Sequence, residues 1–276
     1  MGVLKTRIIT GAVGGAAAIA ILLFFPAWAI RLMVGAILVM AMHELLAAEN
    51  CQHRGVTVAA LIFAAVCPFL DLWNGFSLLW IALIAYVLVL AMLLIVSHES
   101  LPFEHIAYVL AMSVAVVLPI GSLAYIRALP SHGIAYLFLT MIIAWFSDMG
   151  AYFAGSFLGK HKLCEKISPK KTVEGFFGGI VTAVLFGVLG AWIYQTAFLN
   201  AAGQQVNYWL VALIALVTAP ISVVGDLFCS VIKRHRGIKD FGNIFPGHGG
   251  ILDRFDSLIF VTPILYILCQ ELPLIV

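Results

Sequence analysis

The chain has 276 residues, of which 63% are hydrophobic and 10% are charged, and its formal net charge is +2. Soluble domains are typically about 45–50% apolar and about 25% charged, so the composition excludes an ordinary soluble protein. The small net charge is uninformative as a total, and no nucleic-acid partner is expected. Five cysteines lie far apart without a Cys-x-x-Cys pair, which predicts free thiols rather than disulfides or a zinc site. We therefore predict one integral-membrane domain over residues 1–276.

The apolar stretches predict an all-α, polytopic membrane protein with about nine transmembrane helices. A helix needs about 20 apolar residues to cross a bilayer core. Backbone polar groups in lipid must be satisfied internally, which favours helices over irregular chain. The predicted spans cover residues 8–28, 30–48, 55–72, 76–97, 105–126, 133–157, 173–196, 207–229 and 251–271.

The first span has features of a signal peptide. Lys5 and Arg7 precede an apolar run, and Ala27-Trp28-Ala29 imitates a small-x-small cleavage site. Because further apolar spans follow at once, we interpret this segment as an uncleaved first transmembrane helix.

The placement of Lys and Arg predicts the orientation in the membrane. With nine spans and a cytoplasmic N-terminus, only Arg31 and Arg127 of the 15 basic residues fall on the outer side. Such an excess of inner basic residues is the usual pattern of membrane proteins. The loops 158–172 and 230–250 then share the cytoplasmic face, where the polar site is expected. The predicted location is the plasma (inner) membrane, with lipid around the chain.

Glycine pairs at one-turn spacing occur at Gly11/Gly15, Gly155/Gly159 and Gly175/Gly179. Small residues at this spacing let helix backbones approach closely. We interpret the pairs as packing sites within the bundle, with a homodimer interface as the alternative.

An ionisable residue interrupts the predicted sixth span, at Asp148. Charged groups in membrane helices are costly and usually face a cavity or a partner. Asp148 is therefore a candidate functional carboxylate, and a structural ion pair with a basic residue is the alternative.

A basic stretch precedes the predicted seventh span: Ser168-Pro169-Lys170-Lys171-Thr172-Val173-Glu174-Gly175. Pro169 suits a first helical turn, and free N–H groups at a helix start beside two lysines predict an anion site. The alternative is a basic loop that only touches anionic lipid.

The longest polar stretch runs from the eighth predicted span into the ninth. Asp226, Ser230 and the Lys233/Arg234 pair recur at helical spacing, so they share one helix face. A glycine-rich loop follows, with Gly242 and the run Pro246-Gly247-His248-Gly249-Gly250, and it can bring backbone close to a ligand.

Two more carboxylates follow this loop, Asp253 and Asp256, with Arg254 between them. Clustered carboxylates suit a hard cation such as Mg²⁺, which prefers oxygen ligands and nucleotide phosphates. An ion-pair network that locks two helices is the alternative. His43-Glu44, near the end of the second span, is interpreted as interfacial and is left out of the site.

The ungapped run from Ser230 to Asp256, SVIKRHRGIKDFGNIFPGHGGILDRFD, resembles the signature of the phosphatidate cytidylyltransferase family, also called CDP-diacylglycerol synthases. The stretches around Asp148 and Ser168–Gly175 are also similar to blocks of that family. The resemblance is close over roughly residues 145–260. Residues 141–260 are therefore expected to form the catalytic helices and loops, and residues 1–140 a less specific helical scaffold.

The resemblance implies a nucleotidyltransferase that converts CTP and phosphatidate to CDP-diacylglycerol and pyrophosphate with Mg²⁺, and a second cation can take part. We assign Asp226 and Asp253 as the leading metal ligands, with Asp256 and Asp148 in support. The catalytic and phosphate-neutralising candidates are Lys233, Arg234, Lys239, His248 and Arg254. The substrate-binding candidates are Ser168, Lys170, Lys171 and Ser230.

Three other functions remain open at this point. A CTP-dependent polyprenol or phytol kinase would use a similar basic, Asp-rich face but release CDP. A cation-coupled transporter would place its acidic residues near the bilayer midplane on discontinuous helices. A CDP-alcohol phosphotransferase would carry a long Asp-Gly…Asp-x3-Asp pattern, which this sequence lacks.

Overall fold

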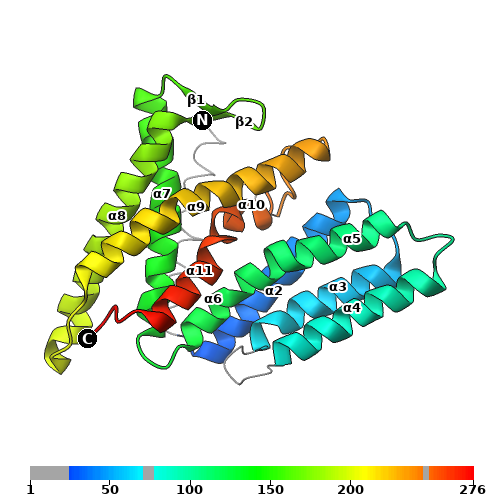
Figure 1. The fold of residues 1–276 in the computed structure, drawn as a ribbon, viewed down its shortest axis with the longest axis horizontal. Helices are drawn as coiled ribbons and strands as arrows, with labels where there is room; N and C mark the ends of the chain where they lie inside the picture. The colour runs from blue at the N-terminus through cyan, green and yellow to red at the C-terminus, as the bar shows by residue number, and fades with distance from the viewer. Residues whose placement is uncertain (1–24, 71–77, 245–248) are drawn as a thin grey trace. The chain divides into compact units, whose positions relative to one another are not determined.

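The computed structural model describes residues 25–70, 78–244 and 249–276, and these residues are predominantly helical (Figure 1). Six helices in this part of the chain are long and apolar enough to cross a membrane. The predicted span 8–28 lies almost entirely outside the described residues. The class of an all-α integral membrane protein is confirmed, whereas the count of nine spans stays a prediction.

The chain divides into two compact units. The first unit takes Met1–Tyr125 and His235–Phe255, and the second takes Ile126–Arg234 and Asp256–Val276. The glycine-rich loop thus belongs with the N-terminal helices, and the basic stretch belongs with the later ones.

The first unit is built from apolar helices. They are α2 (Ala27–Ala48), α3 (Arg54–Val66) with the 3-10 turn η1 (Cys67–Phe69), α4 (Leu78–Val96), α5 (Phe103–Met112), the π-helical turn η2 (Ser113–Val117), α6 (Leu118–Ala128) and the short α10 (Leu252–Phe255). Helix α6 runs three residues past the unit boundary. Fully buried Leu38, Met42 and Leu45 on α2 lie at helical spacing and form part of the core.

The second unit holds α7 (Gly133–Leu158), the strands β1 (Lys162–Cys164) and β2 (Ser168–Thr172), α8 (Val173–Tyr194) with η3 (Gln195–Leu199) and η4 (Asn200–Ala202), α9 (Tyr208–His235), η5 (Asp256–Leu258) and α11 (Val261–Glu271). The two strands form an antiparallel hairpin in which Lys162 pairs with Thr172 and Cys164 with Ser168.

Two sequence expectations about local structure are wrong. Pro169 lies in strand β2 rather than in a first helical turn, and α8 begins only at Val173. Residues 251–271 do not form one continuous helix, because α10 spans four residues, η5 three and α11 eleven. The polar Asp253–Ser257 segment makes tertiary contacts in place of a regular helical ladder.

Helices α7 and α8 pack closely along their length (Figure 1). A Cβ placed at Gly175 would lie 2.7 Å from the carbonyl oxygen of Ala151, and one at Gly178 would overlap the Cβ of Ala154. The Thr182 hydroxyl donates a hydrogen bond of 2.9 Å to the carbonyl of Phe146 across this contact. The packing role predicted for the later glycine pairs is confirmed, whereas Gly11/Gly15 lies outside the described residues.

This contact predicts the sign of a stability change. Alanine is a better helix former than glycine by about 0.8–1 kcal/mol, yet Gly178→Ala adds a methyl group where Ala154 already lies. We expect Gly178→Ala to lower the thermal unfolding midpoint in detergent, at an overpacking cost of about 1–3 kcal/mol. Val181→Ala is the matched control, since Val181 on the same helix is 65% exposed. A midpoint at or above that of the wild type for Gly178→Ala would contradict the close contact.

Candidate active site

Asp226 on α9 is held from two directions within the second unit. Its Oδ2 forms an ion pair of 2.6 Å with the Nζ of Lys171 on β2. Its Oδ1 accepts a hydrogen bond of 3.3 Å from the hydroxyl of Ser230, one turn further along α9. Lys233 lies on the same helix face and is only 9% exposed. The helical spacing predicted from sequence therefore places Asp226, Ser230 and Lys233 on one face of α9, and the tertiary structure adds the Lys171 ammonium.

Asp256 and Asp148 belong to the same polar cluster. The backbone of Asp256 packs so closely on α9 that a Cβ at Gly225 would overlap its carbonyl oxygen. Removal from water, followed by the nearby carboxylate of Asp226, raises the pKa of Asp256 to about 8. Asp148 contributes to the same rise, and the Lys233 ammonium opposes it. Carboxylates from α9 and α7 thus both repel the carboxylate of Asp256, and Lys233 attracts it.

This cluster fits a hard cation. Its donors are carboxylate and hydroxyl oxygens, which suit Mg²⁺ better than a soft metal. Among residues 25–70, 78–244 and 249–276, no group of three or more His, Cys, Asp or Glu side chains lies ready to hold a metal. Mg²⁺ in nucleotide enzymes is usually bound by one or two carboxylates together with water and substrate phosphates. Asp226 and Asp256 are of the type that such a site requires.

Backbone carbonyls of the basic hairpin accept one hydrogen bond from α9 and one from within the hairpin. The Nε of Arg234 donates to the carbonyl of Ile167 at 3.3 Å, so the end of α9 is tied to the hairpin turn. The Nζ of Lys162 donates to the carbonyl of Pro169 at 2.7 Å. Lys170 is exposed and Ser168 is partly buried. The hairpin places Lys171 beside Asp226.

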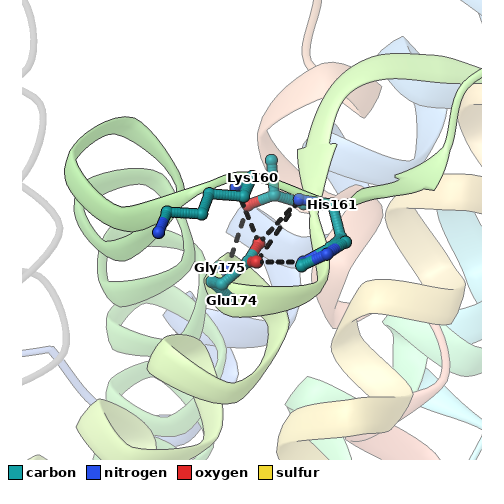
Figure 2. A network of polar contacts seen from close by, with 5 residues as sticks. Lys160, His161, Glu174 and Gly175 are labelled. Carbon is teal, nitrogen blue, oxygen red and sulfur yellow. Dashed lines mark hydrogen bonds and ion pairs between the residues drawn. The ribbon is translucent and has the colours of Figure 1, made fainter.

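Glu174 fixes the turn that joins α7 to the hairpin (Figure 2). Its carboxylate accepts the backbone N–H of Lys160 at 3.1 Å and that of His161 at 3.2 Å, and it lies 2.6 Å from the Nδ1 of His161. Thr172 caps α8 by accepting the N–H of Gly175 at 3.1 Å, as expected of an N-cap threonine. In the Thr-x-Glu-Gly motif, Thr172 therefore caps the start of α8, and Glu174 holds the turn between α7 and β1.

In the first unit, Asp253 organises the two ends of the glycine-rich loop. Its Oδ2 accepts the N–H of Phe241 at 2.8 Å and the N–H of Gly250 at 3.0 Å. Gly249 adopts a φ of 83°, which L side chains rarely adopt. Asp253 is 8% exposed, so these bonds replace the water it has lost. The structure gives Asp253 a loop-closing role, and its metal-binding role stays a prediction.

Two acidic residues of the first unit were not assigned to the site from sequence: Glu44 was interpreted as interfacial and left out, and Glu49 was not considered. Glu44 on α2 is 4% exposed and accepts the N–H groups of Ile251 and Leu252, each at 2.9 Å. Glu49, which follows α2, forms an ion pair with Arg236, whose guanidinium also lies 5.1 Å from the ring centroid of Tyr108. An ionisable group in an apolar helix was the signal used for Asp148, and the same signal would have found Glu44.

The candidate residues therefore separate as follows. The second unit contains Asp148, Ser168, Lys170, Lys171, Asp226, Ser230, Lys233, Arg234 and Asp256. The first unit contains Lys239, Asp253 and Arg254. His248 lies outside the described residues.

Comparison with known proteins identifies the class. The sequence model of the Cytidylyltransferase family matches residues 5–272, so the chain belongs to this family and is a nucleotidyltransferase. Curated relatives named phosphatidate cytidylyltransferase include those of Bacillus subtilis strain 168, 40% identical over 195 residues, and Staphylococcus aureus strain COL, 40% identical over 187 residues. A relative of the same name from Staphylococcus epidermidis strain ATCC 35984 is 44% identical over 174 residues.

These alignments cover most of each chain. They span 71% of this chain and 69% of the Bacillus protein, and 68% of each chain for Staphylococcus aureus. For Staphylococcus epidermidis they span 63% of each chain. Membership in the family favours nucleotidyl transfer over the transporter and CDP-alcohol phosphotransferase interpretations.

The loop-closing role of Asp253 predicts a difference between two substitutions. Asparagine retains an oxygen that can accept the N–H groups of Phe241 and Gly250, whereas alanine retains none. We expect Asp253→Ala to speed amide hydrogen exchange at Phe241 and Gly250, and Asp253→Asn to leave it close to that of the wild type. Equally fast exchange in both variants would contradict this role. The activity of Asp253→Asn reports separately on the metal role, which needs the negative charge.

Proposed function

We propose that this nucleotidyltransferase transfers the cytidylyl group of CTP to phosphatidate, giving CDP-diacylglycerol and pyrophosphate. The observation that carries the proposal is the cluster of Asp148, Asp226 and Asp256 with Lys171 and Lys233 in one unit of an apolar, membrane-spanning chain. The resemblance of the Ser230–Asp256 run and the names of the relatives supply the substrates.

The reaction requires that the two substrates be aligned and their negative charge neutralised, and it does not require a strong general base. An oxygen of the lipid phosphate, already ionised at neutral pH, attacks the α-phosphorus of CTP. A new P–O bond forms, and the bond from the α-phosphorus to the oxygen that bridges it to the β-phosphorus breaks. Pyrophosphate leaves with that oxygen and its electron pair, so no proton has to be removed from the nucleophile. The main barrier is repulsion between two anions, which positioned positive charges reduce.

Basic side chains of the second unit are proposed to bind the phosphates. Lys171 on the hairpin and Lys233 on α9 lie near the acidic cluster, and Lys170 and Arg234 are their sequence neighbours on the same elements. Ser168 and Ser230 offer hydroxyl groups that can position phosphate oxygens. Lys239, Arg254 and His248 are proposed to add further contacts from the signature run.

Asp226 and Asp256 are proposed to hold Mg²⁺, with Asp148 in support and Asp253 as a further candidate. When bound, Mg²⁺ would neutralise charge on the triphosphate and on the leaving pyrophosphate. Asp226 is kept in place by Ser230 and Lys171, so its oxygens are oriented before substrate arrives.

We also propose that the site faces the cytoplasm at the plasma membrane. The support is the bias of Lys and Arg toward one side of the nine-span prediction, since such basic stretches are usually cytoplasmic. CTP is available on that side. Phosphatidate would then react with its headgroup at the interface and its acyl chains in lipid.

The products distinguish nucleotidyl transfer from a kinase reaction. We expect the purified full-length protein in detergent, given labelled CTP, phosphatidate and Mg²⁺, to release pyrophosphate and form CDP-diacylglycerol in equal amounts. Release of CDP with a phosphorylated lipid would reject the proposal. A parallel reaction without phosphatidate measures any hydrolysis of CTP.

The role of Asp226 predicts a loss of turnover without a loss of fold. Removing a group that positions or neutralises charge in a transition state typically costs on the order of 100-fold or more in kcat. We expect Asp226→Ala to show such a loss while membrane insertion remains normal. Glu165→Ala is the control, because Glu165 is an exposed carboxylate in the hairpin turn of the same unit. Near-normal turnover of Asp226→Ala at all Mg²⁺ concentrations would refute its assignment as a metal ligand.

A further inference from the structure

Within the first unit, the buried carboxylate of Glu44 on α2 accepts hydrogen bonds from the backbone near the end of the signature run Ser230–Asp256. Both oxygens of Glu44 are used, since Oε1 accepts the N–H of Ile251 and Oε2 accepts the N–H of Leu252, each at 2.9 Å. These amides lie at the start of α10, which has no preceding helical turn to satisfy them. Glu44 is 207 residues away from Ile251 in the sequence, so the contact is purely tertiary.

The same carboxylate explains two glycines of the signature. A Cβ at Gly242 would overlap the Oε1 of Glu44, and one at Gly250 would lie 2.6 Å from its Cδ. The three nearest atoms at each glycine all belong to Glu44. Neither glycine has a positive φ. Glycine is therefore required at both positions by the close approach of the carboxylate rather than by backbone conformation.

We call residues 241–244 and 249–252 the loop flanks. Asp253 ties the two flanks to each other through Phe241 and Gly250, and Glu44 ties them to α2. Lys239 lies two residues before the first flank and Arg254 two residues after the second. Any shift of the flanks would move both basic side chains, because each is joined to a flank by only one intervening residue.

We propose that Glu44 is a positioning residue for the reaction. Its carboxylate fixes the loop flanks, and through them it orients the phosphate-binding groups Lys239 and Arg254 of the signature. The inference rests on the proposed function only in taking these groups to bind substrate phosphates. Glu44 itself is satisfied by backbone amides, so it does not touch substrate.

Glu44→Gln is the primary test. Glutamine keeps one accepting oxygen but turns an NH₂ group toward the other amide, so one of the two N–H groups loses its partner. We expect kcat/KM to fall by about tenfold to 100-fold, as small misplacements of reacting groups do. The KM for CTP and for phosphatidate would be measured separately, and the one that rises identifies the substrate whose phosphates the groups bind.

Tyr86→Phe is the matched control for stability. Tyr86 is a buried residue of the same unit, and its hydroxyl shares a hydrogen bond of 2.9 Å with Ser113. The substitution removes one buried hydrogen bond and keeps the ring that stacks on Phe63. We expect its kcat/KM to stay within about twofold of the wild type at a similar loss of thermal stability, because buried hydrogen bonds have similar net worth.

Gly242→Ala tests the proposal even if Glu44→Gln does not fold. The added methyl group should push the flank away from Glu44 and reduce turnover. In a double-mutant cycle, Gly242→Ala should cost much less in a Glu44→Ala background, because the overlapping carboxylate is gone. Additive losses in this cycle would overturn the inference.

Hydrogen exchange and activity together distinguish a failure of the Glu44 role from a failure of the proposed function. Hydrogen exchange at Ile251 and Leu252 should speed up in Glu44→Gln whatever the substrate of the enzyme. Faster exchange with unchanged kcat/KM would overturn the positioning role, and so would unchanged exchange. A wild-type protein that is inactive with CTP and phosphatidate would reject the proposed function, and the exchange result would still report on the Glu44 contact.

Discussion

The dominant constraint on this protein is the cost of an acidic side chain in a chain built for lipid. The buried carboxylates Glu44 and Asp253 and the partly buried Asp226 each have specific partners. Asp226 is bound by a lysine and a serine, Glu44 by two amides, and Asp253 by two more. Because buried acids without partners are strongly disfavoured, each acid dictates the position of the backbone or base that satisfies it. Within each unit, the acids and the groups that satisfy them therefore fix one another's positions.

Glycines leave room for close contacts around the acidic residues. On α7, which carries Asp148, and on α8, glycines let the two backbones approach closely. At the signature run, Gly242 and Gly250 leave room for the Glu44 carboxylate. A glycine-rich stretch suggests a flexible, ligand-binding loop, yet these two glycines are packed against a buried side chain of the protein itself.

The two corrections have a common cause. Pro169 was expected in a helix because proline suits a first turn, but the stretch that contains it pairs with residues 162–164 as a hairpin. Residues 251–271 were expected to cross the membrane because they are apolar, but the helix is interrupted where Asp253 binds the N–H of Phe241 and Asp256 packs on Gly225. In both places the observed structure depends on contacts that a window of local propensity or hydropathy does not register: a strand pairing for Pro169 and polar contacts for Asp253 and Asp256.

The sequence by itself determined the membrane class, most of the later helices and the polar residues of α9, because hydropathy and helical spacing are local properties. It also pointed to the family through one long, specific run. Only the tertiary structure decided that Lys171 pairs with Asp226, that Asp253 closes a loop, and that Glu44 belongs with the signature. Those partners are separated by as many as 208 residues, and which amide meets which carboxylate depends on how the helices pack.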